Sequence, residues 1–145
     1  MSSSPKGAKR QNAKWRSGLA DVVLDASALM ALIRGEAGAD RVLASLPSAI
    51  ISTVNLAEVH TKLVAAGLEE KLAWWHIAEA GCGAVSFDEE QARVAGGLIR
   101  VTRPLGLSLG DRACLALAIK REAAVYTTDR AWKSLDLGIE IQVIR

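Results

Sequence analysis

The sequence predicts a single α/β domain in which a parallel sheet of about five strands is covered by helices on both faces. Its 145 residues are enough for one domain with a substantial core. Half of the residues are apolar and only 4% are aromatic, so this core is expected to be aliphatic. Short apolar runs alternate along the chain with longer segments of helical composition, as is typical of strands joined by helices.

The expected strands are short apolar runs, and the first of them ends in an acidic residue, Asp25. They cover residues 21–25, 49–52, 84–87, 124–128 and 139–144. In sheets of this class, ligands bind outside the carboxyl ends of the strands. Residues that directly follow a strand are therefore the first candidates for a functional site.

The expected helices lie between these strands. They cover residues 26–34, 37–46, 54–66, 69–80, 88–102 and 109–121, with a short helix around Trp132. Pro47 and Gly67 end two of them, because proline cannot continue a helix and glycine favours the position after its last turn. Thr53 and Ser108 are the expected N-caps.

Two helices carry residues whose role stays open. Gly96 and Gly97 weaken the helix over 88–102 unless a neighbouring backbone packs closely there. Trp74 and Trp75 lie on the amphipathic helix over 69–80, where they could contact a partner or be buried in the core.

The first twenty residues differ in charge from the rest of the chain. They contain five basic residues and no acidic one, whereas 13 basic and 16 acidic residues follow. We therefore expect a basic, disordered tail over residues 1–20 and a slightly acidic domain over residues 21–145. The tail could be a solvated leader or an arm that contacts nucleic acid or another anionic surface. The net charge of +2 does not by itself indicate nucleic-acid binding.

Several classes of protein are disfavoured. Cys82 and Cys114 form no Cys-x-x-Cys pair, and neither His60 nor His76 has a His or Cys at zinc-ligand spacing. Isolated cysteines of this kind are typical of a reducing compartment, so we expect a cytoplasmic protein. No secretory signal is recognised, and no apolar run approaches the roughly 20 residues of a membrane-spanning helix.

Four acidic residues stand where they could converge on one crevice. Asp25 ends the first expected strand and Asp129 directly follows the fourth, whereas Glu58 and Asp111 lie on helices that leave or approach neighbouring strands. Clustered carboxylates repel one another unless a cation neutralises them. Mg²⁺ and Mn²⁺ prefer such oxygen ligands, and they can activate a water for attack on a phosphodiester. The pattern indicates metal-dependent phosphodiester hydrolysis.

Each acid also has an ordinary explanation when it is taken alone. Asp25 and Asp129 could each cap a helix, and Asp111 could form a capping box with the serine three residues before it. Glu58 could form an exposed ion pair with Lys62, one turn further along its helix. The functional interpretation therefore depends on the joint placement of the four side chains.

Four polar residues stand next to these acids in the sequence. Ser27 and Thr128 could donate hydrogen bonds to a ligand carboxylate or to a phosphate, although both could equally be turn hydroxyls. Arg112 and Arg130 each directly follow a proposed ligand and are the favoured candidates for phosphate contacts.

The four acidic segments resemble, in order and flanks, the acidic motifs of PIN domains. They are residues 24–29 (LDASAL), 55–59 (NLAEV), 108–118 (SLGDRACLALA) and 125–132 (VYTTDRAW). They are most similar to the VapC-type toxins of bacterial toxin–antitoxin systems, and the resemblance extends from about residue 21 to 144. The basic tail departs from the family pattern, in which the first strand lies almost at the N-terminus.

The resemblance implies a PIN-like three-layer domain with the activity of a Mg²⁺- or Mn²⁺-dependent endoribonuclease that cleaves tRNA, rRNA or mRNA. It implies that Asp25, Glu58, Asp111 and Asp129 are both catalytic and metal-binding, with Ser27 as a nearby hydroxyl. It also implies a homodimer that is inhibited by a small antitoxin protein.

Two other functions compete with this one. A phosphatase with an aspartyl nucleophile usually has a second acid two residues after the first, and Ser27 occupies that position here. A non-catalytic PIN-fold module that binds RNA or protein is the main alternative. The presence of all four acids argues against this non-catalytic module. A metal-binding measurement separates the module from the nuclease.

Overall fold

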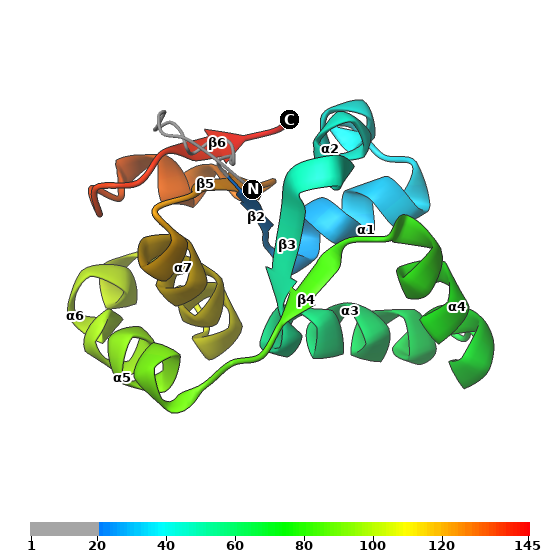
Figure 1. Ribbon diagram of the computed structural model, residues 1–145, viewed down its shortest axis with the longest axis horizontal. Coiled ribbons are helices and arrows are strands. Elements are labelled where there is room, and N and C mark those ends of the chain that lie inside the picture. Colours follow the sequence, from blue (N-terminus) through cyan, green and yellow to red (C-terminus); the bar gives the residue numbers. More distant parts are fainter. Residues whose placement is uncertain (1–20) are drawn as a thin grey trace, which may run out of the picture.

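The computed structural model describes residues 21–145, so the tail predicted for residues 1–20 lies outside the described part (Figure 1). The described chain forms one five-stranded sheet in the order β4-β3-β2-β5-β6, with every neighbouring pair parallel. The strands are β2 (Val22–Leu24), β3 (Ala49–Ser52), β4 (Gly83–Val85), β5 (Ala124–Thr127) and β6 (Ile141–Val143). The predicted fold class is confirmed.

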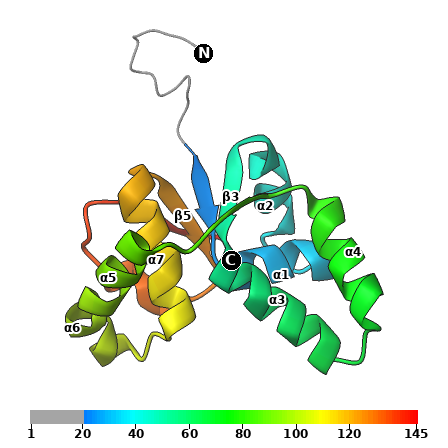
Figure 2. The ribbon, with the colours of Figure 1, turned by 60° about the horizontal axis from the view of Figure 1, so that its bottom comes forward.

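Helices cover both faces of this sheet. They are α1 (Ala26–Arg34), α2 (Ala39–Ser45), α3 (Thr53–Ala65), α4 (Glu70–Ala80), α5 (Glu89–Gly97), α6 (Ile99–Thr102) and α7 (Leu109–Arg121), with short 3-10 helices η1 (Leu46–Ser48), η2 (Arg103–Leu105) and η3 (Arg130–Ser134). Helices α1 to α4 lie on one side and α5 to α7 on the other, as Figures 1 and 2 both show. The result is the expected three-layer arrangement.

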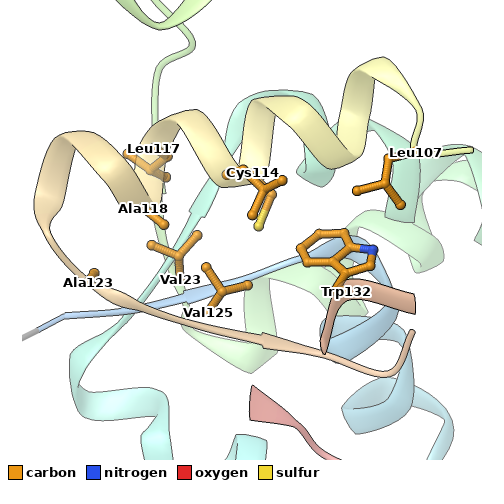
Figure 3. Packing of buried hydrophobic residues seen from close by; sticks show 9 residues of the cluster. Val23, Leu107, Cys114, Leu117, Ala118, Ala123, Val125 and Trp132 are labelled. Carbon is orange, nitrogen blue, oxygen red and sulfur yellow. The ribbon is translucent and has the colours of Figure 1, made fainter. Parts of the chain in front are cut away.

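The core divides between the two faces because successive strand residues point in opposite directions. Val23 and Val125 pack under α7, beside Cys114 and Leu117 (Figure 3). Leu24, one residue after Val23, points the other way and belongs to the cluster on the side of α1 and α2. The core is aliphatic as expected, except for the fully buried Trp132.

The strand order creates the crevice that this fold class uses for ligands. Strands β3 and β4 lie on one side of β2, and the chain then crosses the sheet through α5–α7 to add β5 and β6 on the other side. The switch point lies at the carboxyl ends of β2 and β5. Here the backbone N–H of Asp25 donates to the Tyr126 carbonyl at 3.1 Å. This bond extends the pairing of the two strands by one residue and brings Asp25 alongside the end of β5.

Three of the differences from the expected boundaries have clear local reasons. The helix over 88–102 is split at Leu98 into α5 and α6, directly after the two weakening glycines. The N-cap of α3 is Ser52, not Thr53, whose hydroxyl instead accepts a bond from the Phe87 N–H at 3.2 Å. Helix α2 begins only at Ala39, because Gly38 before it adopts a φ of 97°.

The tryptophan pair lies on the surface. Trp74 and Trp75 of α4 are 47% and 54% exposed, so the core alternative is wrong for both. Leu72 of the same helix is also 47% exposed, which makes this stretch of α4 unusually apolar for a surface. None of the helices within residues 21–145 is long and apolar enough to cross a membrane.

Candidate active site

Asp25 is the buried centre of the candidate site. It is 3% exposed and caps α1, because its Oδ1 accepts a bond from the Ala28 N–H at 2.8 Å. The same oxygen accepts from the Ser27 hydroxyl at 2.7 Å, and Oδ2 accepts from the Thr127 hydroxyl at 2.5 Å. The capping explanation is therefore correct, but it accounts for only one of three bonds to this carboxylate.

The burial of Asp25 shifts its protonation. Loss of hydration raises the pKa of the carboxyl to about 6, even though the bonds from Thr127, Ser27 and Ala28 lower it. The negative charge of Asp111 adds to the rise. Burial thus makes the ionised form of Asp25 more costly than that of an exposed aspartate.

Two hydroxyl groups tie the end of β5 to this carboxylate. The Ser27 hydroxyl accepts from the Thr128 N–H at 2.9 Å, and the Thr127 hydroxyl accepts from the Asp129 N–H at 3.1 Å. Asp129 itself is exposed and caps η3 by accepting from the Ala131 N–H at 2.9 Å. Sequence reasoning missed Thr127, because only the pairing of β2 with β5 shows that it faces Asp25.

Glu58 turns toward α7 and away from the neighbour expected on its own helix. Its Oε1 accepts from the Asn55 side-chain amide at 2.8 Å, and the same amide donates to the Gly110 carbonyl at 2.9 Å. A Cβ added at Gly110 would lie 2.5 Å from the Glu58 carboxylate. Within residues 21–145 no Glu58–Lys62 ion pair forms. The surface-pair explanation is therefore wrong.

Asp111 forms the predicted capping box at the start of α7. Its N–H donates to the Ser108 hydroxyl at 3.1 Å, and its Oδ2 accepts from the Ser108 N–H at 2.9 Å. This bond engages one carboxylate oxygen of a half-buried side chain. The cap also fixes the first turn of α7, against which Glu58 is packed.

The buried thiol of Cys114 is subject to the charges of three of the acids. This fully buried thiol lies on α7 one turn after Asp111. Its pKa is raised well above its usual range, first by burial and then by the charges of Asp25, Asp111 and Glu58. Carboxylates from three separate elements thus influence the same thiol. Asp129 is linked to Asp25 only by its backbone N–H, which donates to the Thr127 hydroxyl, whereas its carboxylate caps η3.

The donor chemistry at this end of the sheet suits a hard cation. Every candidate ligand is an oxygen, and Asn55 adds a buried side-chain oxygen that accepts no hydrogen bond within the described part of the chain. In the same part, no three acidic, His or Cys side chains lie near enough together to hold an ion by themselves. The residues fit Mg²⁺ or Mn²⁺ by their chemistry.

The two arginines next to the acids differ in their surroundings. Arg112 is half-buried and donates to the Ala95 carbonyl at 3.0 Å, so its guanidinium joins α7 to α5. Arg130 lies exposed on η3, directly after Asp129. Of the two, Arg130 is the more exposed.

Comparison with known proteins identifies the fold family. Residues 22–137 match the model of the PIN domain. The chain belongs to the PIN-domain family. No curated protein sequence is significantly similar to it.

Several solved structures share the fold of this chain at low sequence identity. DNA-bound VapBC from Salmonella typhimurium matches with a TM-score of 0.69 and 18% identity, over 86% of this chain and 98% of that one. VapBC2 from Rickettsia felis, bound to a promoter DNA fragment, matches with a TM-score of 0.67 and 16% identity, over 83% and 96%. VapBC-5 from Mycobacterium tuberculosis matches with a TM-score of 0.58 and 23% identity, over 88% of this chain and 99% of that one. The likeness to toxin–antitoxin structures is one of fold.

Proposed function

We propose that this PIN domain is a divalent-metal-dependent endoribonuclease and the toxin of a toxin–antitoxin pair. The observation that carries the proposal is the packing of the Glu58 carboxylate against the first turn of α7, the turn that carries Asp111, whose charge acts in turn on the buried Asp25. It is supported by the family match and by the position of the acids at the switch point of a parallel sheet.

Asp25, Glu58, Asp111 and Asp129 are the residues that would hold Mg²⁺ or Mn²⁺. The bound ion would supply an activated water and neutralise charge on the phosphodiester. The hydroxyls of Ser27 and Thr127 orient the Asp25 carboxylate by donating to its two oxygens, as outer hydrogen bonds do at metal sites. Thr128 and Arg130 are proposed to contact the RNA phosphates.

The proposal predicts RNA cleavage that depends strictly on a divalent cation. Purified protein incubated with tRNA, rRNA and synthetic single strands is expected to cut in millimolar Mg²⁺ or Mn²⁺ and to stop on addition of EDTA. Restoring the cation should restore cleavage. Undiminished cleavage in EDTA would exclude the mechanism. RNA binding without cleavage in either metal would instead indicate the non-catalytic PIN-fold module.

We also propose an antitoxin partner and a homodimer. Several fold neighbours are toxin–antitoxin complexes, and the exposed Leu72, Trp74 and Trp75 of α4 give this chain an apolar surface suited to a helical protein segment. Co-expression with the protein encoded next to it should yield a co-purifying complex in which RNA cleavage is suppressed. If the neighbouring protein neither co-purifies nor relieves toxicity, the pairing is wrong. Light scattering of the free protein tests whether it forms a dimer.

A further inference from the structure

Asn55 has a buried side-chain amide that donates two hydrogen bonds to the candidate site. It lies in the first turn of α3 and is 1% exposed. Its Nδ2 donates to Glu58 Oε1 at 2.8 Å and to the Gly110 carbonyl at 2.9 Å. A carbonyl and an ionised carboxylate can only accept, so these two partners fix which end of the amide faces them.

The arrangement is unfavourable as a purely structural contact. The Asn55 Oδ1 is buried without a donor among the residues that the structure describes. An unpaired buried acceptor costs stability, and an apolar side chain of similar size would avoid that cost. An asparagine at this position is understandable if its role is to hold the Glu58 carboxylate in place.

The group it binds is one that would otherwise be free to move. Glu58 is half-buried, and its long side chain could turn to solvent and toward Lys62 one helical turn away. The Asn55 amide instead links Glu58 to the backbone of α7 beside Asp111. The absence of a Cβ at Gly110 leaves the space that the Glu58 carboxylate occupies.

We propose that Asn55 is a positioning residue that holds the Glu58 carboxylate against the first turn of α7 and thereby sets the affinity of the site for a divalent cation. This inference rests on the proposed metal-dependent function. Residues that orient metal ligands through hydrogen bonds typically change metal affinity by roughly 10- to 100-fold when they are replaced.

A double-mutant cycle tests the proposal with Mn²⁺ binding as the readout. Asn55→Leu is expected to weaken Mn²⁺ binding, measured by calorimetry, about tenfold. In a Glu58→Ala background the same replacement should change the dissociation constant less than about twofold, because Asn55 then has no carboxylate to hold. If the two replacements weaken binding independently, the positioning role is wrong. Asn55→Ala repeats the cycle without added bulk if the leucine variant unfolds.

Gln91 provides a matched control for a generic loss of a buried amide. It is 2% exposed, donates to the Ser86 carbonyl at 3.1 Å, and has a side-chain oxygen without a partner in the described residues. Melting in EDTA should show similar changes in melting temperature for Gln91→Leu and Asn55→Leu, whereas only the latter should weaken Mn²⁺ binding. If both replacements weaken Mn²⁺ binding equally, the proposal is wrong.

The same measurements separate this inference from the proposed nuclease. Wild-type protein that binds Mn²⁺ but cuts no RNA would contradict the nuclease, and the cycle would still decide the role of Asn55. A wild type that binds no Mn²⁺ would contradict both.

Discussion

Replacing Asp25 with asparagine is expected to lower metal-dependent RNA cleavage by about three orders of magnitude, because a neutral amide is a far weaker ligand for a hard cation. The fold should survive. The introduced asparagine would keep a side-chain oxygen that accepts from Ala28 and Ser27, and the Thr127 hydroxyl can rotate to accept from the new amide. Cleavage by the variant within about tenfold of wild type would exclude Asp25 from the catalytic centre.

The same variant should change how stability depends on pH in EDTA. The pKa of Asp25 is about 6 in the folded protein against an ordinary value of 3.8, so the folded state binds this proton more tightly than the unfolded state. The resulting stability is fully present below about pH 4 and is lost as pH rises through about 6. It amounts to about 3 kcal/mol.

Urea unfolding of wild type and Asp25→Asn between about pH 4 and 8 measures this effect as a difference. The stability of the variant relative to wild type should rise with pH across the window and level off above about pH 7. Asp136→Asn, which replaces an exposed aspartate, is the control and should run parallel to wild type. Parallel curves for Asp25→Asn would show that burial of this carboxylate carries no penalty.

Gly110→Ala is expected to reduce cleavage about a hundredfold while leaving the stability in EDTA within about 1 kcal/mol of wild type. The new Cβ would lie 2.5 Å from the Glu58 carboxylate, which must move. Since that carboxylate ends a flexible side chain, it can swing away at little cost to the fold. Alanine also favours the helical backbone more than glycine. The variant therefore displaces Glu58 without altering it.

Gly96→Ala is the matched control for Gly110→Ala. This glycine lies in α5, is exposed, and has no described atom within 4 Å of the position of an added Cβ. It should show the gain in helix stability with normal cleavage and normal Mn²⁺ binding. If Gly110→Ala behaves in the same way, Glu58 has no part in the site.

Much of the fold could be predicted because its signals are local. Each buried strand is a short apolar run, and helices end where glycine or proline stands, as at Gly35 and Gly81, which adopt positive φ. An acid that directly follows a strand of a parallel sheet must lie near the carboxyl edge, so Asp25 and Asp129 could be placed without coordinates. The capping box of Asp111 is also a local pattern, because Ser108 and Asp111 are three positions apart.

The fold class, the elements and the end of the sheet where the acids lie thus follow from the order of residues alone. The long-range contacts around these acids do not, because they join distant parts of the chain. The pairing of β2 with β5 sets Thr127 against Asp25, across 102 positions. The packing of α3 on α7 turns Glu58 away from Lys62 and gives Asn55 its place. These contacts depend on strand order and on which helix faces meet, and neither can be read from the residues within a single element.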